Sequence, residues 1–306
     1  MKGVENQSYP CLLFTMSFKQ LSVIGAGRVG QTLAALLART KCLAINEVCN
    51  RSLSSAQLAV DFIGHGQGVA NLSSMRPSEL WMISCVDSEV AAVGKLLAAT
   101  GVVRAGDVVF HTSGALPSTV LAPLHACGAH VASIHPVKSF ADPALAVETF
   151  DGTWCGVEGD DSACVELTRL FGSIGASVFR LTAEAKELCH IGHVFASNYL
   201  VTILDYAQQL YSAAGVPESV RGAFLKSIVE GTLQNVGVLG GERALTGPVK
   251  RGDTVVIERH LELLQTQAPE LYGAYVELAG GALRIAERAG LPSEKVEAVA
   301  KLLAAR

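Results

Sequence analysis

The sequence predicts an α/β protein, with a Rossmann-type, doubly wound and mostly parallel sheet followed by an all-helical domain. Apolar strand-like runs alternate with helical runs as far as about residue 180, which is typical of right-handed crossovers on a parallel sheet. A glycine-rich turn at residues 25–30 lies between the first strand and the first helix, where such folds bind a dinucleotide. Beyond Leu181 strand-like runs become scarce and long helical runs dominate.

These observations divide the chain into three segments. Residues 1–17 precede the first strand and form an N-terminal arm. We expect residues 18–180 to form the dinucleotide-binding Rossmann domain. Residues 181–306 form the helical domain, to which we assign substrate binding and dimerisation.

The composition narrows the possible partners and compartments. Half of the 306 residues are apolar, and the net charge of −4 provides no field that would attract nucleic acid or an anionic membrane. None of the eight cysteines forms a Cys-x-x-Cys pair, and most of them are expected to be buried thiols in a reducing compartment. No apolar run is long enough to span a bilayer. We therefore expect a cytoplasmic protein with a small-molecule substrate.

The glycine turn predicts the dinucleotide site. Gly25 permits the tight turn, Gly27 lets the backbone approach a pyrophosphate, and Gly30 lets the helix lie close to its strand. The N-terminus of the helix then offers N–H groups and a partial positive charge to the phosphates. The predicted contacts from this turn are Gly25, Ala26, Gly27, Arg28, Val29 and Gly30.

The remaining elements of the first half follow from periodicity and from turn residues. Residues 87–89 are expected to cap the third helix, and residues 64–68 are expected to form a loop. The predicted strands cover residues 21–24, 43–49, 80–86, 107–110, 129–134, 151–158 and 176–180. The first predicted helix follows the glycine turn and ends near Arg39. Further helices are predicted at residues 54–63, 90–99, 117–127 and 162–171.

Ligands of such sheets lie beyond the carboxyl ends of the strands, so these ends predict the remaining cofactor contacts. An NAD site carries an acidic residue about 20 residues past the glycines, and here that place is Asn50, followed by Arg51 and Ser52. Neutral and cationic donors suit a 2′-phosphate, so the sequence favours NADP over NAD. Arg51 as an exposed loop charge is the alternative, and Glu47 lies inside its strand. The other contacts expected at strand ends are Cys85, Val86, Asp87 and Thr112.

The helical half begins with a long predicted helix from Thr182, its N-cap, to a stop at Gly215. It is apolar on nearly every side, which predicts burial all round. Its polar side chains form one stripe, because their spacings are four, three and four residues. Such a stripe needs hydrogen-bonding partners or a wet cleft, and ordered water remains the alternative to function. The stripe consists of Lys186, His190, His193 and Ser197.

Further helices are predicted at residues 218–231, 256–265, 269–288 and 293–304. A loop at residues 245–253 carries a hydrogen-bond donor, Arg251, and an acceptor, Asp253, between tight turns. It is either functional or a helix connector with a surface ion pair.

Five segments together resemble one family: residues 25–30, 111–114, 133–136, 186–198 and 246–253. The sequence is similar to bacterial Rossmann-like oxidoreductases with a C-terminal helical domain of unknown function. Their clan includes pyrroline-5-carboxylate reductase, ketopantoate reductase and the β-hydroxyacid dehydrogenases. The resemblance implies an NADP-type cofactor, a helical domain of the 6-phosphogluconate-dehydrogenase C-terminal type, and a homodimer built on the helical domains. It implies no substrate.

One carry-over concerns the predicted catalytic residues. β-Hydroxyacid dehydrogenases and ketopantoate reductases place a catalytic Lys, with an Asn four residues later, where this chain has Lys186 and His190. We expect Lys186 to stabilise developing negative charge and His190 to supply a proton, each disfavouring a charge on the other. Ser113 and His135, at strand ends, would orient the substrate.

These residues favour an NADP-dependent oxidoreductase that transfers hydride between NADP(H) and a small C=O or C=N metabolite. A non-catalytic NADP-binding sensor, whose helical half binds a protein partner, is the alternative. A zinc enzyme using His135, His190 and His193 is a third reading, but no motif completes the ligand set, so no metal is expected.

Overall fold

The computed structural model describes residues 19–305, so the N-terminal arm expected at residues 1–17 lies outside the described residues. The chain forms two compact units that divide between Ala196 and Ser197. This division falls later than the domain boundary expected at residues 180/181. The first helix after that boundary, α7 (Ala183–Val194), packs against the strand β7 (Trp154–Gly159) of the first unit.

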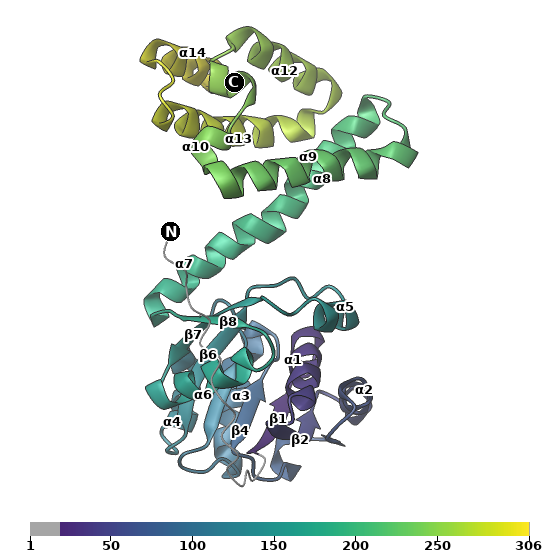
Figure 1. Ribbon diagram of the computed structural model, residues 1–306, viewed down its shortest axis with the longest axis vertical. Helices are drawn as coiled ribbons and strands as arrows, with labels where there is room; N and C mark the ends of the chain where they lie inside the picture. The colour runs from purple at the N-terminus through teal and green to yellow at the C-terminus, as the bar shows by residue number, and fades with distance from the viewer. Residues whose placement is uncertain (1–18, 306) are drawn as a thin grey trace. The chain divides into compact units, whose positions relative to one another are not determined.

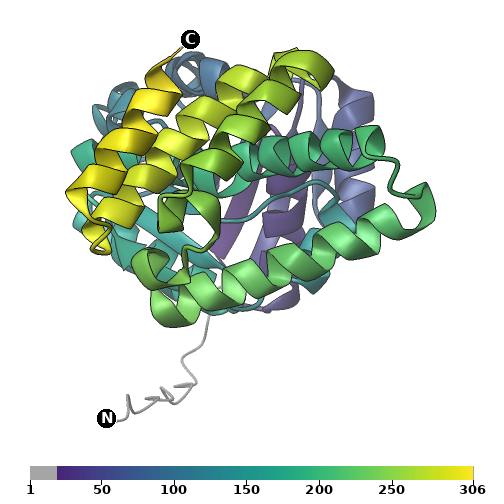
Figure 2. The ribbon, with the colours of Figure 1, turned by 90° about the horizontal axis from the view of Figure 1, so that it is seen from above.

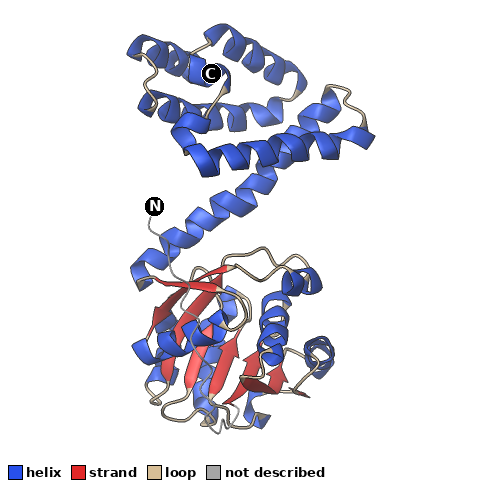
Figure 3. Ribbon diagram, in the orientation of Figure 1, coloured by secondary structure: helices blue, strands red, loops and turns tan. Residues whose placement is uncertain are grey.

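The first unit is built on an eight-stranded sheet with the order β3-β2-β1-β4-β5-β6-β7-β8 (Figure 3). All neighbouring strands are parallel except β6 and β7. The first six strands have the doubly wound order of a Rossmann fold, as predicted. The strands are β1 (Lys19–Ile24), β2 (Leu43–Cys49), β3 (Gln67–Val69), β4 (Leu80–Ile83), β5 (Val108–His111), β6 (His130–Pro136), β7 (Trp154–Gly159) and β8 (Ser177–Arg180).

Helices cover both faces of this sheet (Figure 1). Leu80 and Met82 face one layer, whereas Trp81 and Ile83 face the other, because side chains alternate along a strand. The first layer contains α1 (Arg28–Arg39), α2 (Leu53–Ile63) and α6 (Asp161–Gly172). The second contains α3 (Asp87–Thr100), the 3₁₀ turn η2 (Ser118–Leu121) and α4 (Ala122–His125).

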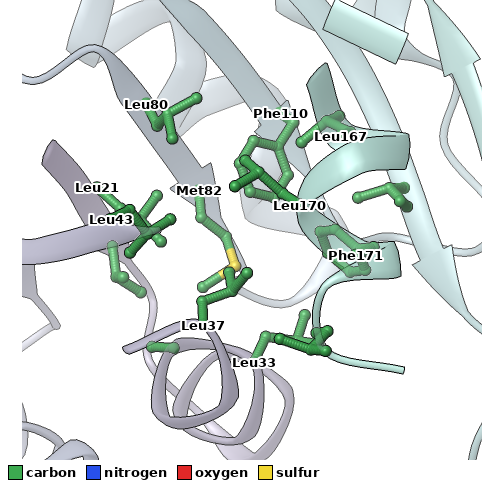
Figure 4. Packing of buried hydrophobic residues seen from close by; sticks show 14 of the residues in the cluster. Leu21, Leu33, Leu37, Leu43, Leu80, Met82, Phe110, Leu167, Leu170 and Phe171 are labelled. Carbon is green, nitrogen blue, oxygen red and sulfur yellow. The ribbon is translucent and has the colours of Figure 1, made fainter. Parts of the chain in front are cut away.

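The largest core cluster fills the first layer (Figure 4). Leu33 and Leu37 of α1 and Leu170 of α6 are fully or almost fully buried against the sheet. Phe110 of β5 meets Phe171 of α6 edge to face, with ring centroids 6.2 Å apart. Burial of each such large side chain stabilises the fold by about 1.5–3 kcal/mol.

Several predicted boundaries in the first unit were wrong. β4 ends at Ile83, not at residue 86, and α3 begins at Asp87 with no side-chain cap at Val86. Asp87 and Glu89 therefore lie in the first turn of α3 and do not cap it. Their negative charges interact favourably with the helix dipole.

Other elements were not predicted. β3 overlaps the end of the expected loop, and the expected helix at residues 117–127 is divided into η2 and α4. Pro123 at the second position of α4 fits the first turn of a helix but not its interior. A short helix, α5 (Pro143–Glu148), is capped by Asp142 and packs beside α1.

The long helical run after Thr182 has the predicted ends but not the predicted burial. It consists of α7, a π-helical segment η3 (Phe195–Tyr199) and α8 (Leu200–Ala213). Thr182 caps it and Gly215 ends it with φ +77°. Burial all round is not reached within the single chain, in which Leu188 is 72% exposed and Val201 is 67% exposed. Lys186 is the one buried residue of the run in the described structure.

The second unit is helical, and three of its helices enclose a core of their own. Figure 2 shows α14 beside α13, and Ile257, Leu283 and Val299 pack between them and α12. The helices that follow α8 are α9 (Glu218–Leu239), α10 (Gly241–Ala244), α11 (Gly247–Arg251), α12 (Thr254–Gln267), α13 (Pro269–Arg288) and α14 (Ser293–Ala304).

The loop at residues 245–253 is a structured connector. It contains α11, and Asp253 caps α12 by accepting a hydrogen bond from Val256 N at 3.3 Å. The ion pair of Arg251 with Asp253 is long, at 3.9 Å. These contacts give the loop a structural role.

Two further observations concern the described residues as a set. No helix among them is long and apolar enough to cross a bilayer. The seven cysteines that the structure describes are all free thiols.

Candidate functional site

The glycine turn between β1 and α1 has a geometry that only glycine permits. Gly25 has φ +82°, and a Cβ there would lie 2.6 Å from Cys85 N. Gly27 has open space around its Cβ position, and no side chain caps α1. The N-terminal N–H groups of α1 therefore meet an uncovered surface, as the binding of a pyrophosphate requires.

The predicted cofactor residues lie along one edge of the sheet. Ile24 is paired with Cys49 and with Ile83, and Ile83 is paired with His111. The four strands β1, β2, β4 and β5 therefore end side by side, and the residues that follow them share that edge.

Asn50 braces the glycine turn. Its Oδ1 accepts a hydrogen bond from Ala26 N at 2.6 Å, and its Nδ2 donates to Ser55 O at 2.9 Å. The side chain thus ties the turn after β1 to the turn after β2. In this structure both ends of the Asn50 amide are engaged by the protein itself.

Arg51 and Ser52 are exposed in the turn after β2. Ser52 Oγ caps α2 by accepting from Ser55 N at 3.1 Å and lies 3.0 Å from Ser54 Oγ. The carboxylate of Glu47 is remote from this role, since it is 3% exposed and bonded to Arg76 Nε at 2.7 Å. The turn therefore presents a guanidinium and hydroxyls, and no carboxylate.

Contacts connect the glycine turn to a pocket beyond β5 and β6. Gly30 packs closely on Ser84, because a Cβ added at Gly30 would lie only 3.2 Å from Ser84 Oγ. Ser84 Oγ accepts a hydrogen bond from Thr112 Oγ1 at 3.1 Å. The carbonyl of Thr112 accepts in turn from His135 Nδ1 at 3.1 Å. His135 lines the pocket.

The other predicted contacts near this edge lie around the start of α3. Val86 and Asp87 are exposed. Cys85 is partly buried beside Gly25, and burial raises the pKa of its thiol to about 11. The Cys85 thiol is therefore uncharged at physiological pH and forms part of the wall of the site.

The pocket lies entirely within the first unit, between the ends of β5 to β8 and α7. Most of the stripe predicted on α7 faces it. Its lining consists of Gly114, His135, Gly156, Phe179, Leu181, Lys186, Cys189, His190 and His193.

Lys186 is a buried ammonium that the protein holds on two sides. It is 3% exposed, donates a hydrogen bond to Ser133 Oγ, and lies 3.8 Å from Glu158 Oε1. Glu158 is itself buried and accepts two hydrogen bonds from Ser118, from N at 2.6 Å and from Oγ at 2.8 Å. Burial lowers the pKa of Lys186 to about 8, and the charges of Glu158 and Asp87 limit the shift.

The cause of this shift differs from the sequence expectation. Repulsion between Lys186 and His190 was expected to lower the pKa of the lysine, whereas burial is the main cause. Ser118, Ser133 and Glu158 were not predicted as site residues. A carboxylate at the end of the apolar strand run was the one available signal for Glu158.

His135 is held as a neutral ring. A carbonyl oxygen can only accept, so His135 Nδ1 donates to Thr112 O and Nε2 is left as an acceptor. Burial is the main cause that lowers the pKa of His135 to about 4. Its ring centroid lies 5.9 Å from those of both His190 and His193. Gly114 permits this cluster, because a Cβ there would lie 2.5 Å from His190 Cδ2.

His193 and Cys189 complete the wall on α7. Cys189 Sγ lies 3.6 Å from His193 Nε2, and His193 Nδ1 is buried without a hydrogen-bond partner. Burial, and to a smaller extent His190, lowers the pKa of His193. Although three imidazoles cluster here, no group of three or more side chains in residues 19–305 is arranged to hold a metal ion.

Two predicted residues lie outside the pocket. Ser113 is buried in the turn after β5, where its Oγ accepts hydrogen bonds from Ala115 N and Leu116 N. The π-helical segment that begins at Phe195 changes the helical phase, so Ser197 does not continue the stripe. The structure thus brings together Lys186, His190 and His135, but not Ser113.

Comparison with known proteins agrees with this two-part architecture. Residues 14–136 match the Rossmann-like domain, and residues 153–280 match a domain of unknown function, DUF2520. The chain therefore combines these two domains, as the family resemblance implies. No curated protein matches the sequence.

Three solved structures share most of the fold. A protein from Bacteroides fragilis described as a "putative NADP oxidoreductase" has 22% identity and a TM-score of 0.72, over 87% of this chain and 98% of that one. A protein from Thermotoga maritima has 26% identity and a TM-score of 0.63, over 88% and 99%. An imine reductase variant from Myxococcus stipitatus, in complex with NAD⁺, has 15% identity and a TM-score of 0.58, over 89% and 94%.

Proposed function

We propose that this chain, with its Rossmann-like and DUF2520 domains, is an NADP-dependent oxidoreductase that acts on a small C=O or C=N metabolite. The observation that carries the proposal is the buried Lys186 in a pocket linked by contacts to the glycine turn. A buried ammonium has a high desolvation cost. In a reaction that develops negative charge, this ammonium would stabilise that charge.

The cofactor assignment rests on the edge formed by β1, β2, β4 and β5. The uncovered N-terminus of α1 suits the pyrophosphate, and Gly27 allows its close approach. Arg51 and the hydroxyls of Ser52 and Ser54 suit a 2′-phosphate, and no carboxylate stands in that turn to accept a 2′-hydroxyl. NADP(H), when bound, would supply or accept the hydride.

The chain's own groups then account for charge and protons. The Lys186 ammonium, fixed by Ser133 and Glu158, stabilises negative charge at the reacting group. His190, one turn later on the same helix, exchanges a proton with the reacting group. His135 offers its Nε2 as an acceptor that orients a hydroxyl.

The homodimer is part of the same proposal. In the second unit, α8 and α9 bury no residue within the chain. Their large exposed apolar side chains include Val201, Ile203, Val220, Phe224, Ile228, Leu233, Val236 and Val238. A second copy of the chain is the occupant we assign to this surface, because the family resemblance implies a dimer built on the helical domains.

Variants of the pocket test the chemistry. A panel of keto acids and cyclic imines would be screened with NADPH, and turnover compared for wild type, Lys186→Ala and His190→Ala. Each variant should lower turnover by about 10²–10⁴-fold, the contribution of a general acid–base group, with NADPH affinity nearly unchanged. Leu188→Ala, at an exposed position of the same helix, is the control. Wild-type turnover in both variants would show that the stripe is structural.

A further inference from the structure

We infer that the pocket accepts a carbonyl or hydroxyl group, whose oxygen becomes negative in the transition state, and excludes an iminium cation. The inference rests on the proposed function and narrows its substrate class. It stands on the distribution of charged side chains around Lys186.

The lining presents a cation without an accompanying anion. Lys186 is the one lysine or arginine among the lining residues, and none of them is Asp or Glu. Glu158 is close to Lys186, but it does not line the pocket. Both Glu158 oxygens accept hydrogen bonds from Ser118, which fix the carboxylate beside Lys186 and away from the lining.

The remaining polar groups cannot neutralise a cationic substrate. His135 is neutral, and its ring donates backward to Thr112. His190 and His193 are imidazoles, which carry either no charge or a positive one. Asp87 acts on Lys186 only through its longer-range charge and is exposed at the start of α3. Phe179 is the one aromatic ring besides the histidines in the lining.

An iminium ion would therefore face a buried ammonium without a carboxylate to pair with. Like charges at close range repel strongly where water is excluded. Hydride addition to an iminium also yields a neutral amine, so Lys186 would have no negative charge to stabilise.

A carbonyl substrate would make use of both Lys186 and His190. The reduced cofactor, when bound, would supply hydride to the carbonyl carbon, and the C=O π electrons would move to the oxygen, which becomes negative beside Lys186. That oxygen would take a proton from His190, which completes the alcohol, and the hydride donor would be left oxidised. The reverse sequence oxidises a secondary or primary alcohol. The fold shared with an imine reductase does not bear on this choice, because charge in the site is not set by the fold.

The charge preference can be measured before any substrate is known. Acetate, acetamide and acetamidinium are planar and nearly equal in size, and differ in charge. We would titrate each into the full chain with NADP⁺ present, at constant ionic strength and up to about 0.1 M, where the Debye length is about 10 Å. Binding is followed through the ring-proton NMR signals of His135, His190 and His193.

We expect acetate to bind and acetamidinium to bind at least about tenfold more weakly. Lys186→Met should weaken acetate by about tenfold to a hundredfold, the value of one charge-assisted hydrogen bond, whereas Leu188→Ala should change nothing. Equal or tighter acetamidinium binding, acetate binding that survives Lys186→Met, or no acetate binding at all would each overturn the inference.

Turnover supplies a second arm that separates this inference from the proposed function. In the NADPH-linked screen, ketones or aldehydes should be reduced and cyclic imines should not. Reduction of imines alone would overturn the substrate class and leave the oxidoreductase standing. Absence of NADPH binding, with the acetate preference intact, would overturn the oxidoreductase and leave the charge preference standing.

Discussion

Glu158 Oε1 lies 3.8 Å from Lys186 Nζ, and neither side chain exposes more than 5% of its surface. The two come from β7 and α7, and Ser118 of η2 fixes the carboxylate. Glu158 is therefore a positioning residue, which holds the ammonium at the pocket wall. A buried pair of this kind is costly to break, because the remaining partner is left without compensation.

The first prediction concerns this pair. Glu158→Gln should lower the free energy of unfolding by up to about 3–5 kcal/mol and should lower the pKa of Lys186 further, because the Glu158 charge opposes the effect of burial. Denaturant titration gives the first quantity, and NMR of ¹⁵N-labelled lysine gives the second.

Asp161→Asn is the matched control. Asp161 pairs with Arg180 at 2.8 Å but is 89% exposed, so its loss should cost at most about 1 kcal/mol. Adding Lys186→Met to Glu158→Gln should recover stability, since no unpaired charge remains. Equal costs for Glu158→Gln and Asp161→Asn would contradict the positioning role.

The second prediction concerns acid stability. Burial is the main cause that lowers the pKa of His111 to about 3 and of His135 to about 4, against about 6.5 in an unfolded chain. The unfolded state therefore binds more protons between pH 4 and 6.5, and the free energy of unfolding must fall as the pH drops through that range. Each histidine contributes a slope of at most about 1.4 kcal/mol per pH unit.

His111→Gln should reduce this slope. The His111 ring accepts from Ser113 N and contacts Pro117 O, and an uncharged amide can offer one donor and one acceptor without titrating. Unfolding by denaturant, followed by fluorescence of the buried Trp81, gives stability at each pH. His65→Gln, on an exposed loop, is the control. An unchanged slope in His111→Gln would refute the assignment.

The third prediction concerns cofactor choice. Arg51→Ala should weaken NADPH binding by about tenfold to a hundredfold, the value of one charge-assisted contact to a phosphate, and should leave NADH binding unchanged. Calorimetric titration of both cofactors measures this. Arg39→Ala, at the C-terminal end of α1 and exposed, removes an equal charge away from the strand ends. Tighter NADH than NADPH binding by wild type would contradict the prediction.

The fourth prediction concerns assembly. Light scattering at micromolar concentration should give twice the chain mass of 32.0 kDa. Ile228→Glu, which places a charge on an apolar position of α9 that is 55% exposed, should yield monomers. Leu58→Glu changes a residue of α2 that is 69% exposed and should leave the dimer intact. A monomeric wild type would count against the dimer.

The local elements of this protein were determined by the sequence itself. The strand Leu43–Cys49 and the helices Pro269–Arg288 and Ser293–Ala304 have the bounds that were predicted. Hydrophobic period and turn residues specify such elements, because both depend on neighbours within a few positions along the chain. The glycine turn and the polar stripe on α7 could be predicted from the sequence for the same reason.

Tertiary structure alone decided the surroundings of Lys186. The antiparallel pairing of β6 with β7 sets Ser133 opposite Glu158, and α7 then lays Lys186 across both. It also decided that Ser113 serves a turn instead of the pocket. Whether a polar side chain is paired, buried or available depends on strands and helices far apart in sequence. No period within one element carries that information, because it arises from the register between elements.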